Sequence, residues 1–211
     1  MPSSKRIRSK KETKESQLSR HLISIGVALC GASLGYLLIV FFPIVQNEVV
    51  YALKKPVASD QIITPKSKDF GLVIPKIGAN SPIVANVDPY TESSYQRALT
   101  KGIAHAQGTA FPGTTGTTFL FSHSSVNFYE ATRYNSVFYL IDKLAKKDEI
   151  HVYYKKQRYV YAVTEKKIVD AKDISYLTNK NNGKQLVLMT CWPAGTSLKR
   201  LLIIASITPE S

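Results

Sequence analysis

The strongest constraint on this chain is a stretch of 24 residues without a charged side chain, residues 22–45. A helix of this length can cross the hydrocarbon core of a bilayer, which is roughly 30 Å thick. Secretory signals have a shorter apolar region followed by a small-x-small cleavage site, and no convincing site follows here. We therefore predict an uncleaved signal-anchor helix. The alternative, a buried helix of a soluble protein, is disfavoured because core helices rarely lack charge for so long.

The charges around this helix predict its orientation. Residues 1–21 contain seven Lys or Arg and two Glu. Basic flanks stay on the cytoplasmic side, so we expect a single-pass protein of the cell membrane with a cytoplasmic tail and everything after residue 46 outside. The net charge of +13 suits an anionic membrane or envelope surface. We expect no nucleic-acid partner, because the chain has no groove-reading motif or aromatic-basic repeat.

The chain has two cysteines, and this orientation separates them. Cys30 lies within the predicted span and Cys191 lies outside the membrane, so they cannot pair. A single unpaired thiol in an exported protein suggests a reactive or intermolecularly paired residue. A buried and inert cysteine is an equally good interpretation of count and location alone.

The exported part divides into a linker and one domain. Residues 46–69 are polar and interrupted by Pro, which is typical of a linker, and residues 70–208 suffice for one domain with a single core. Short helices are expected at 92–101 and 136–145. Strands are expected at 71–77, 82–87, 117–122, 149–154, 158–169, 185–190 and 200–207. Many short strands with few helices indicate an all-β barrel or sandwich.

The last two predicted strands bring candidate chemistry together. Cys191 ends one strand and Arg200 opens the next. If the strands pair, Arg200 lies beside Cys191, where a guanidinium favours thiolate over thiol and can donate hydrogen bonds to an oxyanion. The pattern therefore makes Cys191 a candidate nucleophile.

A cysteine nucleophile also needs a histidine to handle protons, and the chain has four. His21 is on the cytoplasmic side, and His151 alternates with apolar strand residues and is predicted to face solvent. His105 and His123 remain. His123 is favoured because it follows an apolar strand, where a rigid scaffold presents a side chain to a loop-lined site.

Taken together, these segments resemble the sortase family over residues 71–207. "LVLMTC" (186–191) resembles the family's nucleophile strand, and "TTFLFSHSS" (117–125) its histidine strand. Arg200 matches the family's arginine. Three further segments match in the expected order: "LVIPKIGANSPIV", "GIAHAQGTAFPGTTG" and "LIDKLAKKDEIHVYYKKQRYVYAV".

The resemblance implies a closed β-barrel of about eight strands with short helices, preceded by one transmembrane helix. It also implies a cysteine transpeptidase that cleaves a C-terminal Leu-Pro-x-Thr-Gly-like sorting signal of exported proteins. The acyl group would pass through a thioester to an amine acceptor, either a peptidoglycan precursor or a pilin lysine. This chemistry requires no metal and no organic cofactor.

The resemblance assigns roles to individual residues. Cys191 is implied as the nucleophile, His123 as the catalytic histidine and Arg200 as the oxyanion or substrate-binding arginine. Thr190 is implied to bind the oxyanion or substrate through the backbone at Thr190–Cys191. Three residues are implied as neighbours of the site: His105, Ser122 and Trp192.

The chain departs from the family pattern at a few positions. Ser122 stands where the family often has Gly, Lys147 precedes Asp148 in place of Gly, and Leu188 or Val187 replaces the first Thr of the nucleophile motif. The departures affect the subclass, for which a housekeeping or class D/E-like enzyme is the expectation.

Two other functions compete with this interpretation. L,D-transpeptidation of peptidoglycan also uses cysteine and histidine, but its signature places arginine two residues after the cysteine, whereas the spacing here is nine. A non-catalytic envelope-binding or assembly module could keep a sortase-like barrel. Such a module has no need of the full set of Cys191, His123 and Arg200.

Overall fold

The computed structural model describes residues 20–39, 63–124, 137–178, 183–194 and 196–208. Most of the predicted cytoplasmic tail, the end of the predicted span and most of the predicted linker lie outside these residues. The chain forms two compact units, Met1–Asn47 and Glu48–Ser211, which are considered separately.

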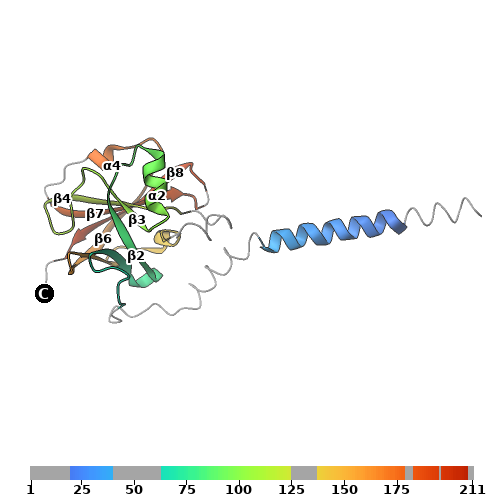
Figure 1. Cartoon of the computed structure of the whole chain (residues 1–211), viewed down its shortest axis with the longest axis horizontal. Helices are drawn as coiled ribbons and strands as arrows, with labels where there is room; N and C mark the ends of the chain where they lie inside the picture. Colours follow the sequence, from blue (N-terminus) through green and yellow to red (C-terminus); the bar gives the residue numbers. More distant parts are fainter. Residues whose placement is uncertain (1–19, 40–62, 125–136, 179–182, 195, 209–211) are drawn as a thin grey trace, which may run out of the picture. The chain divides into compact units, whose positions relative to one another are not determined.

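The described residues of the first unit form a helix, Arg20–Ile39, drawn in blue in Figure 1. Its side chains are exposed along almost its whole length, and most of them are apolar. Among the described residues it is the one helix that is long and apolar enough to cross a membrane. These properties are consistent with a membrane anchor or a signal.

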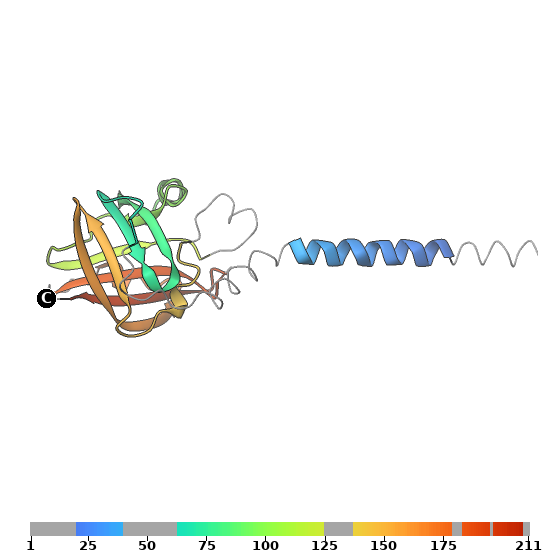
Figure 2. The same ribbon diagram turned by 90° about the horizontal axis from the view of Figure 1, so that it is seen from below.

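Eight strands in the described part of the second unit form a closed barrel, in the hydrogen-bonded order β1-β2-β3-β4-β7-β8-β6-β5. Figure 2 shows them wrapping around a common interior. The strands are β1 (Phe70–Ile74), β2 (Ala79–Val87), β3 (Ile103–Ala106), β4 (Gly116–Phe121), β5 (Glu149–Tyr154), β6 (Gln157–Asp170), β7 (Lys184–Trp192) and β8 (Lys199–Ile207). Closure leaves no sheet edge unpaired. The predicted closed barrel is confirmed.

The barrel is mixed, because β2 pairs with β3 and β4 pairs with β7 in parallel, while the other pairs are antiparallel. Parallel neighbours need a crossover connection. Helix α2 (Glu92–Leu99) supplies it between β2 and β3 (Figure 1). A second short helix, α4 (Ser175–Thr178), lies between β6 and β7.

Strands β7 and β8 are apolar on both faces. Alternate residues such as Leu186 and Leu188 join the core cluster that draws on every strand and fills the barrel interior. Val187 and Leu202 belong to a second cluster on the outer face, where Leu99 of α2 packs over the sheet. The period of two along each strand therefore supplies one core inside the barrel and another outside it.

Two predicted elements differ from the structure, the first strand in its end and the second helix in its type. The first predicted strand ends at Ile74, because Pro75 begins a 3-10 turn, η1 (Pro75–Ile77), and Gly78 closes it with φ of 64°. Proline cannot donate to the strand ladder, and glycine tolerates the left-handed conformation.

The helix predicted at 136–145 is a single 3-10 turn, η2 (Ile141–Lys143), within the described residues. Phe138, Ile141 and Leu144 are buried in the barrel-interior cluster. Their spacing of three fits one face of a short 3-10 segment as well as an α-helix, so periodicity alone could not distinguish the two.

We predict that Gly71→Ala destabilises the barrel. A Cβ at this position would collide with the backbone carbonyl oxygen of Ser67, which cannot rotate away as a side chain could. Such overpacking lowers the free energy of unfolding by about 1–3 kcal/mol, measurable by chemical denaturation. As a control, Gly78→Asn faces open space and keeps a residue that tolerates positive φ, so it should cost much less. Equal effects of the two substitutions would contradict this account.

Candidate active site

Cys191 and Arg200 are direct partners in the antiparallel ladder between β7 and β8. Residues opposite each other in such a ladder have side chains on the same face, with Cβ atoms about 4.5–5.5 Å apart. The predicted pairing is therefore confirmed. The ladder continues for one more pair, Trp192 with Lys199, so residues 193–198 connect the two strands.

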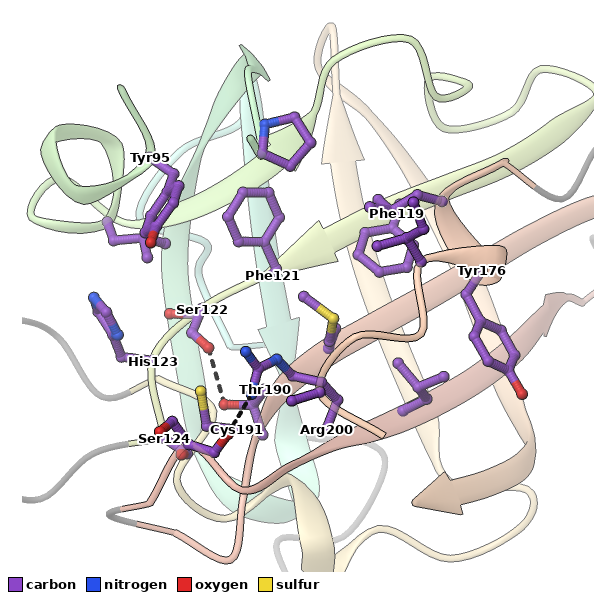
Figure 3. Close-up of a pocket in the computed structure, with 18 of the residues that line it drawn as sticks. Tyr95, Phe119, Phe121, Ser122, His123, Ser124, Tyr176, Thr190, Cys191 and Arg200 are labelled. Carbon is purple, nitrogen blue, oxygen red and sulfur yellow. Dashed lines mark hydrogen bonds between the residues drawn. The ribbon is translucent and has the colours of Figure 1, made fainter. Parts of the chain in front are cut away.

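A pocket of about 500 Å³ contains both side chains. His123, Ser122, Ser124 and Cys191 lie at one end of it, and Phe119 lies at the other (Figure 3). The apolar lining comes from β4, β7, β8, α2 and the β6–β7 connection: Leu99, Phe119, Phe121, Leu177, Met189 and Leu202. The pocket therefore has a polar end at the cysteine and an apolar channel leading away from it.

The parallel pairing of β4 with β7 explains why His123 reaches Cys191. Phe121 and Met189 are the last register partners of these strands. His123 and Cys191 each follow their strand's last partner by two residues. Because parallel strands in register end at the same edge, both side chains arrive at the same end of the pocket.

Thr190 and Ser122 connect the two strand ends. The Ser122 backbone N–H donates to the Met189 carbonyl at 3.2 Å. The Thr190 hydroxyl, which is buried, donates to the Ser122 carbonyl at 2.9 Å (Figure 3). The Thr190 side chain therefore holds the segment that carries His123, and any contact of Thr190 with substrate is left to its backbone.

Helix α2 contributes two side chains that the sequence analysis missed. His123 Nε2 lies 3.2 Å from the amide oxygen Oε1 of Gln96, and the imidazole N–H donates in the tautomer protonated at Nε2. The second side chain is that of Tyr95, the residue before Gln96, which also lines the pocket. No sequence signal indicates that the Gln96 amide would meet a histidine 27 residues later.

Tyr95 lines the same pocket as Cys191 and Arg200. Burial raises the pKa of the Tyr95 phenol, the charge of Glu92 raises it further, and Arg200 and Cys191 act on it in opposite directions. The phenol is thus within electrostatic range of both residues and is protonated at neutral pH. Its ring packs edge-on against Phe121, with centroids 6.4 Å apart.

The guanidinium of Arg200 is oriented by backbone carbonyls. Its Nη1 donates to the carbonyl of Ser197 at 3.2 Å and to that of Lys199 at 3.1 Å. Across the described ranges, no carboxylate lies within ion-pair distance of Arg200. Its positive charge is therefore not neutralised by a described carboxylate and is directed at the pocket.

Two predicted neighbours of the site do not line this pocket. His105 is fully buried on β3, where its Nε2 lies 3.1 Å from the Ala110 carbonyl and 3.0 Å from the Thr109 hydroxyl. Trp192 is half-buried and packs against the barrel-interior cluster. Ser122, in contrast, lines the pocket.

His151 is buried, which corrects the prediction that it faces solvent. Its Nε2 lies 2.9 Å from Oε2 of Glu149. The strand alternation placed it on the face opposite Ile150 and Val152, but that face is also covered. Among the described residues, no group of three His, Cys, Asp or Glu side chains lies close enough to hold a metal ion.

We predict that Thr190→Val destabilises the barrel by about 1–3 kcal/mol, because the buried Ser122 carbonyl loses its hydroxyl donor while the side-chain shape is nearly kept. Chemical denaturation measures the effect. Thr190→Ser keeps the hydroxyl and should retain most of the lost stability. If Val and Ser behave alike, the hydrogen bond is not what Thr190 contributes.

We also predict that His105 makes stability fall in acid. Burial lowers the pKa of His105 below its usual value of 6.5, with the hydrogen bond to Ala110 opposing. The unfolded chain therefore takes up the proton first, so this stability is complete above about pH 6.5 and decreases as the pH falls below it. His105→Gln should flatten the dependence of Tm on pH between about pH 5 and pH 8. An unchanged slope would contradict the assignment.

Comparisons with known proteins agree with this barrel and pocket. Residues 72–208 match the Sortase domain family. Sortase D of Bacillus subtilis (strain 168) is 30% identical over 135 residues, 63% of this chain and 60% of that protein, so the chain spans about 60% of this relative's length.

Two solved structures are similar in fold. Sortase A from Corynebacterium diphtheriae has 25% identity and a TM-score of 0.57, covering 69% of this chain and 62% of that chain. A Clostridium perfringens Sortase D5 transpeptidase has 24% identity and a TM-score of 0.54, covering 70% and 82%. The family match extends over the barrel from β1 to β8 and includes the pocket's cysteine, histidine and arginine. The chain belongs to the sortase family.

Proposed function

We propose that this protein is a membrane-anchored cysteine transpeptidase that acts on a C-terminal sorting signal of exported proteins. The observation that carries the proposal is the register pairing of Cys191 with Arg200 at the end of a pocket that His123 also lines. A thiol, a proton-transfer group and an anion-binding group converge there. These are the groups that acyl transfer through a thioester requires.

In the first half of the reaction, the Cys191 thiolate attacks the Thr carbonyl of a Leu-Pro-x-Thr-Gly-like signal. Negative charge develops on the carbonyl oxygen, and the Arg200 guanidinium and the Thr190–Cys191 backbone are placed to stabilise it. The C–N bond breaks, and the imidazolium of His123 gives its proton to the leaving amine. A thioester to Cys191 remains.

The second half reverses these steps with a different amine. The acceptor, a peptidoglycan precursor or a pilin lysine, gives up a proton to His123 and attacks the thioester carbonyl. The new C–N bond forms, the C–S bond breaks, and the Cys191 thiolate is restored. The apolar channel that leads away from Cys191 would hold the side chains on the acyl side of the signal.

Within this proposal the remaining predicted residues have supporting roles. Ser122 belongs to the site, where its backbone helps to place His123. His105 and Trp192 act on the barrel rather than on substrate, because neither lines the pocket. Acyl transfer between amines through cysteine is redox-neutral and needs no metal or organic cofactor.

The domain organisation follows from the sequence and forms part of the proposal. A cytoplasmic tail at 1–21, a single transmembrane span at 22–45 and a linker at 46–69 hold a catalytic domain at 70–208 on the outer surface of the membrane. Helix Arg20–Ile39 supports the anchor. Enzyme and exported substrates on one surface meet at a raised effective concentration.

We predict that the full-length protein forms a thioester with one of a panel of sorting-signal peptides. Intact mass should show an adduct equal to the N-terminal peptide fragment, absent in Cys191→Ala and kept in Cys30→Ala, the matched control for the chain's other thiol. His123→Ala should slow adduct formation by roughly 10²–10⁴-fold, because general acid catalysis is lost.

Alkylation of Cys191 in the Cys30→Ala protein separates the possible failures. A thiol that alkylates readily but forms no adduct with any peptide would reject the Leu-Pro-x-Thr-Gly-like signal. If Cys191 in a folded protein reacts neither with the alkylating reagent nor with any peptide, catalysis is rejected and a non-catalytic envelope-binding module is favoured.

A further inference from the structure

Two buried hydroxyls beside His123, those of Ser122 and Ser124, have no hydrogen-bond partner among the described residues. Ser122 is 6% exposed and Ser124 is 2% exposed, and among the described residues their Oγ atoms are the buried side-chain oxygens that lack a partner. Buried polar groups are nearly always paired, because leaving one unpaired costs folding free energy. A pair of unpaired hydroxyls flanking one histidine therefore requires an explanation.

Both serines line the pocket at its polar end, next to His123 and Cys191 (Figure 3). The Ser122 backbone is fixed on β7 through its N–H and its carbonyl, so its hydroxyl is presented from a rigid position. A buried hydroxyl that faces a pocket can be satisfied by whatever fills the pocket. The reaction at this end of the pocket indicates which chemical group would pair with the two hydroxyls.

The proposed reaction places an amine at this end of the pocket. His123 gives a proton to the leaving amine and takes one from the entering amine, so each amine nitrogen must come close to the imidazole. The acyl group leads the other way, into the channel lined by Phe119, Met189 and Leu202. The hydroxyls on either side of His123 therefore meet the amine and not the acyl side chains.

An amine that attacks the thioester carbonyl is best bound by uncharged hydrogen-bond acceptors. A carboxylate would stabilise the ammonium form, whose lone pair is occupied, whereas a hydroxyl oxygen accepts an N–H hydrogen bond without favouring the charge. Among the described residues, Asp173 is the one carboxylate that lines the pocket. It accepts hydrogen bonds from the N–H and the hydroxyl of Ser175 on the β6–β7 connection.

We propose that the hydroxyls of Ser122 and Ser124 form the subsite for the primary amine of the acceptor. The two hydroxyls accept hydrogen bonds from the two N–H groups of the bound amine, which aims the nitrogen lone pair at the thioester carbonyl. As the C–N bond forms, one of these two protons passes to His123. The same subsite receives the leaving amine in the first half of the reaction. This inference rests on the proposed function, because it assigns one substrate's place in that site.

The test follows the fate of the thioester in Ser122→Ala and Ser124→Ala full-length protein. Starting from preformed thioester, so that acylation is complete, product formation is measured against the concentration of a primary amine such as triglycine, and hydrolysis of the thioester is measured in the same single-turnover reactions. We expect the KM for the amine to rise about tenfold in each variant, the loss of one neutral hydrogen bond. Hydrolysis should change little, because water does not need the subsite.

Thermal unfolding distinguishes a role of the two hydroxyls in amine binding from a role in the stability of the fold. Removing an unpaired buried hydroxyl should leave Tm equal to or above that of the wild type in both variants. Ser81→Ala is the matched control, because the Ser81 hydroxyl is fully buried but donates to the Pro82 carbonyl at 3.1 Å, away from the pocket. We expect it to lower Tm and leave the KM for the amine unchanged.

The outcomes are distinct. An unchanged KM for the amine in both serine variants, or an equal loss of aminolysis and hydrolysis, overturns the inference while the proposed function stands. A lower Tm in both variants would make the hydroxyls structural and also overturn it. A wild-type protein that forms no thioester rejects the proposed function itself, and the amine subsite with it.

Discussion

Parallel pairing between β4 and β7 brings the site together. Their register ends at Phe121 and Met189, and the two residues after each of these partners carry the histidine and the cysteine to one edge. The hydrogen bond from Thr190 to the Ser122 carbonyl extends this alignment beyond the last ladder pair. A shift of one residue in the register would turn every side chain to the other face and separate the two groups.

The strands β7 and β8 explain how a small barrel can support a pocket on its outside. Strands β7 and β8 alternate between an interior core and an outer core, and α2 covers the outer one. The pocket lies where that outer apolar surface is left uncovered, between α2 and the β6–β7 connection. Barrel closure holds these strands rigidly, so the side chains at their ends are placed without help from long loops.

The polar end of the pocket carries a positive charge without a matching negative charge among the described residues. Arg200 brings a positive charge that no described carboxylate neutralises, and Tyr95, whose pKa is raised by burial, stays a neutral phenol nearby. Such a site suits an anion that appears only during reaction, because the donors are already oriented before the charge develops. The two unpaired serine hydroxyls add acceptors in the same place, so the polar end holds donors for an oxyanion and acceptors for an amine.

Several features could be predicted from the sequence because they depend on local pattern. Strands β5 to β8 were predicted close to their observed bounds, at 149–154, 158–169, 185–190 and 200–207. The order of motifs sufficed to identify the closed barrel. The helix expected at 136–145 was wrong, because a spacing of three apolar residues does not distinguish a 3-10 turn from an α-helix.

The sequence by itself determined seven of the eight described strands, all except β3 (Ile103–Ala106), together with the apolar helix and the opposition of Cys191 and Arg200, since consecutive strands joined by a short turn usually pair. Only the tertiary structure decided that His123 lines the pocket and His105 does not, that His151 is buried, and that Gln96 meets His123. Each of these depends on contacts between segments distant in sequence. Local periodicity says which face a residue occupies but not what covers that face.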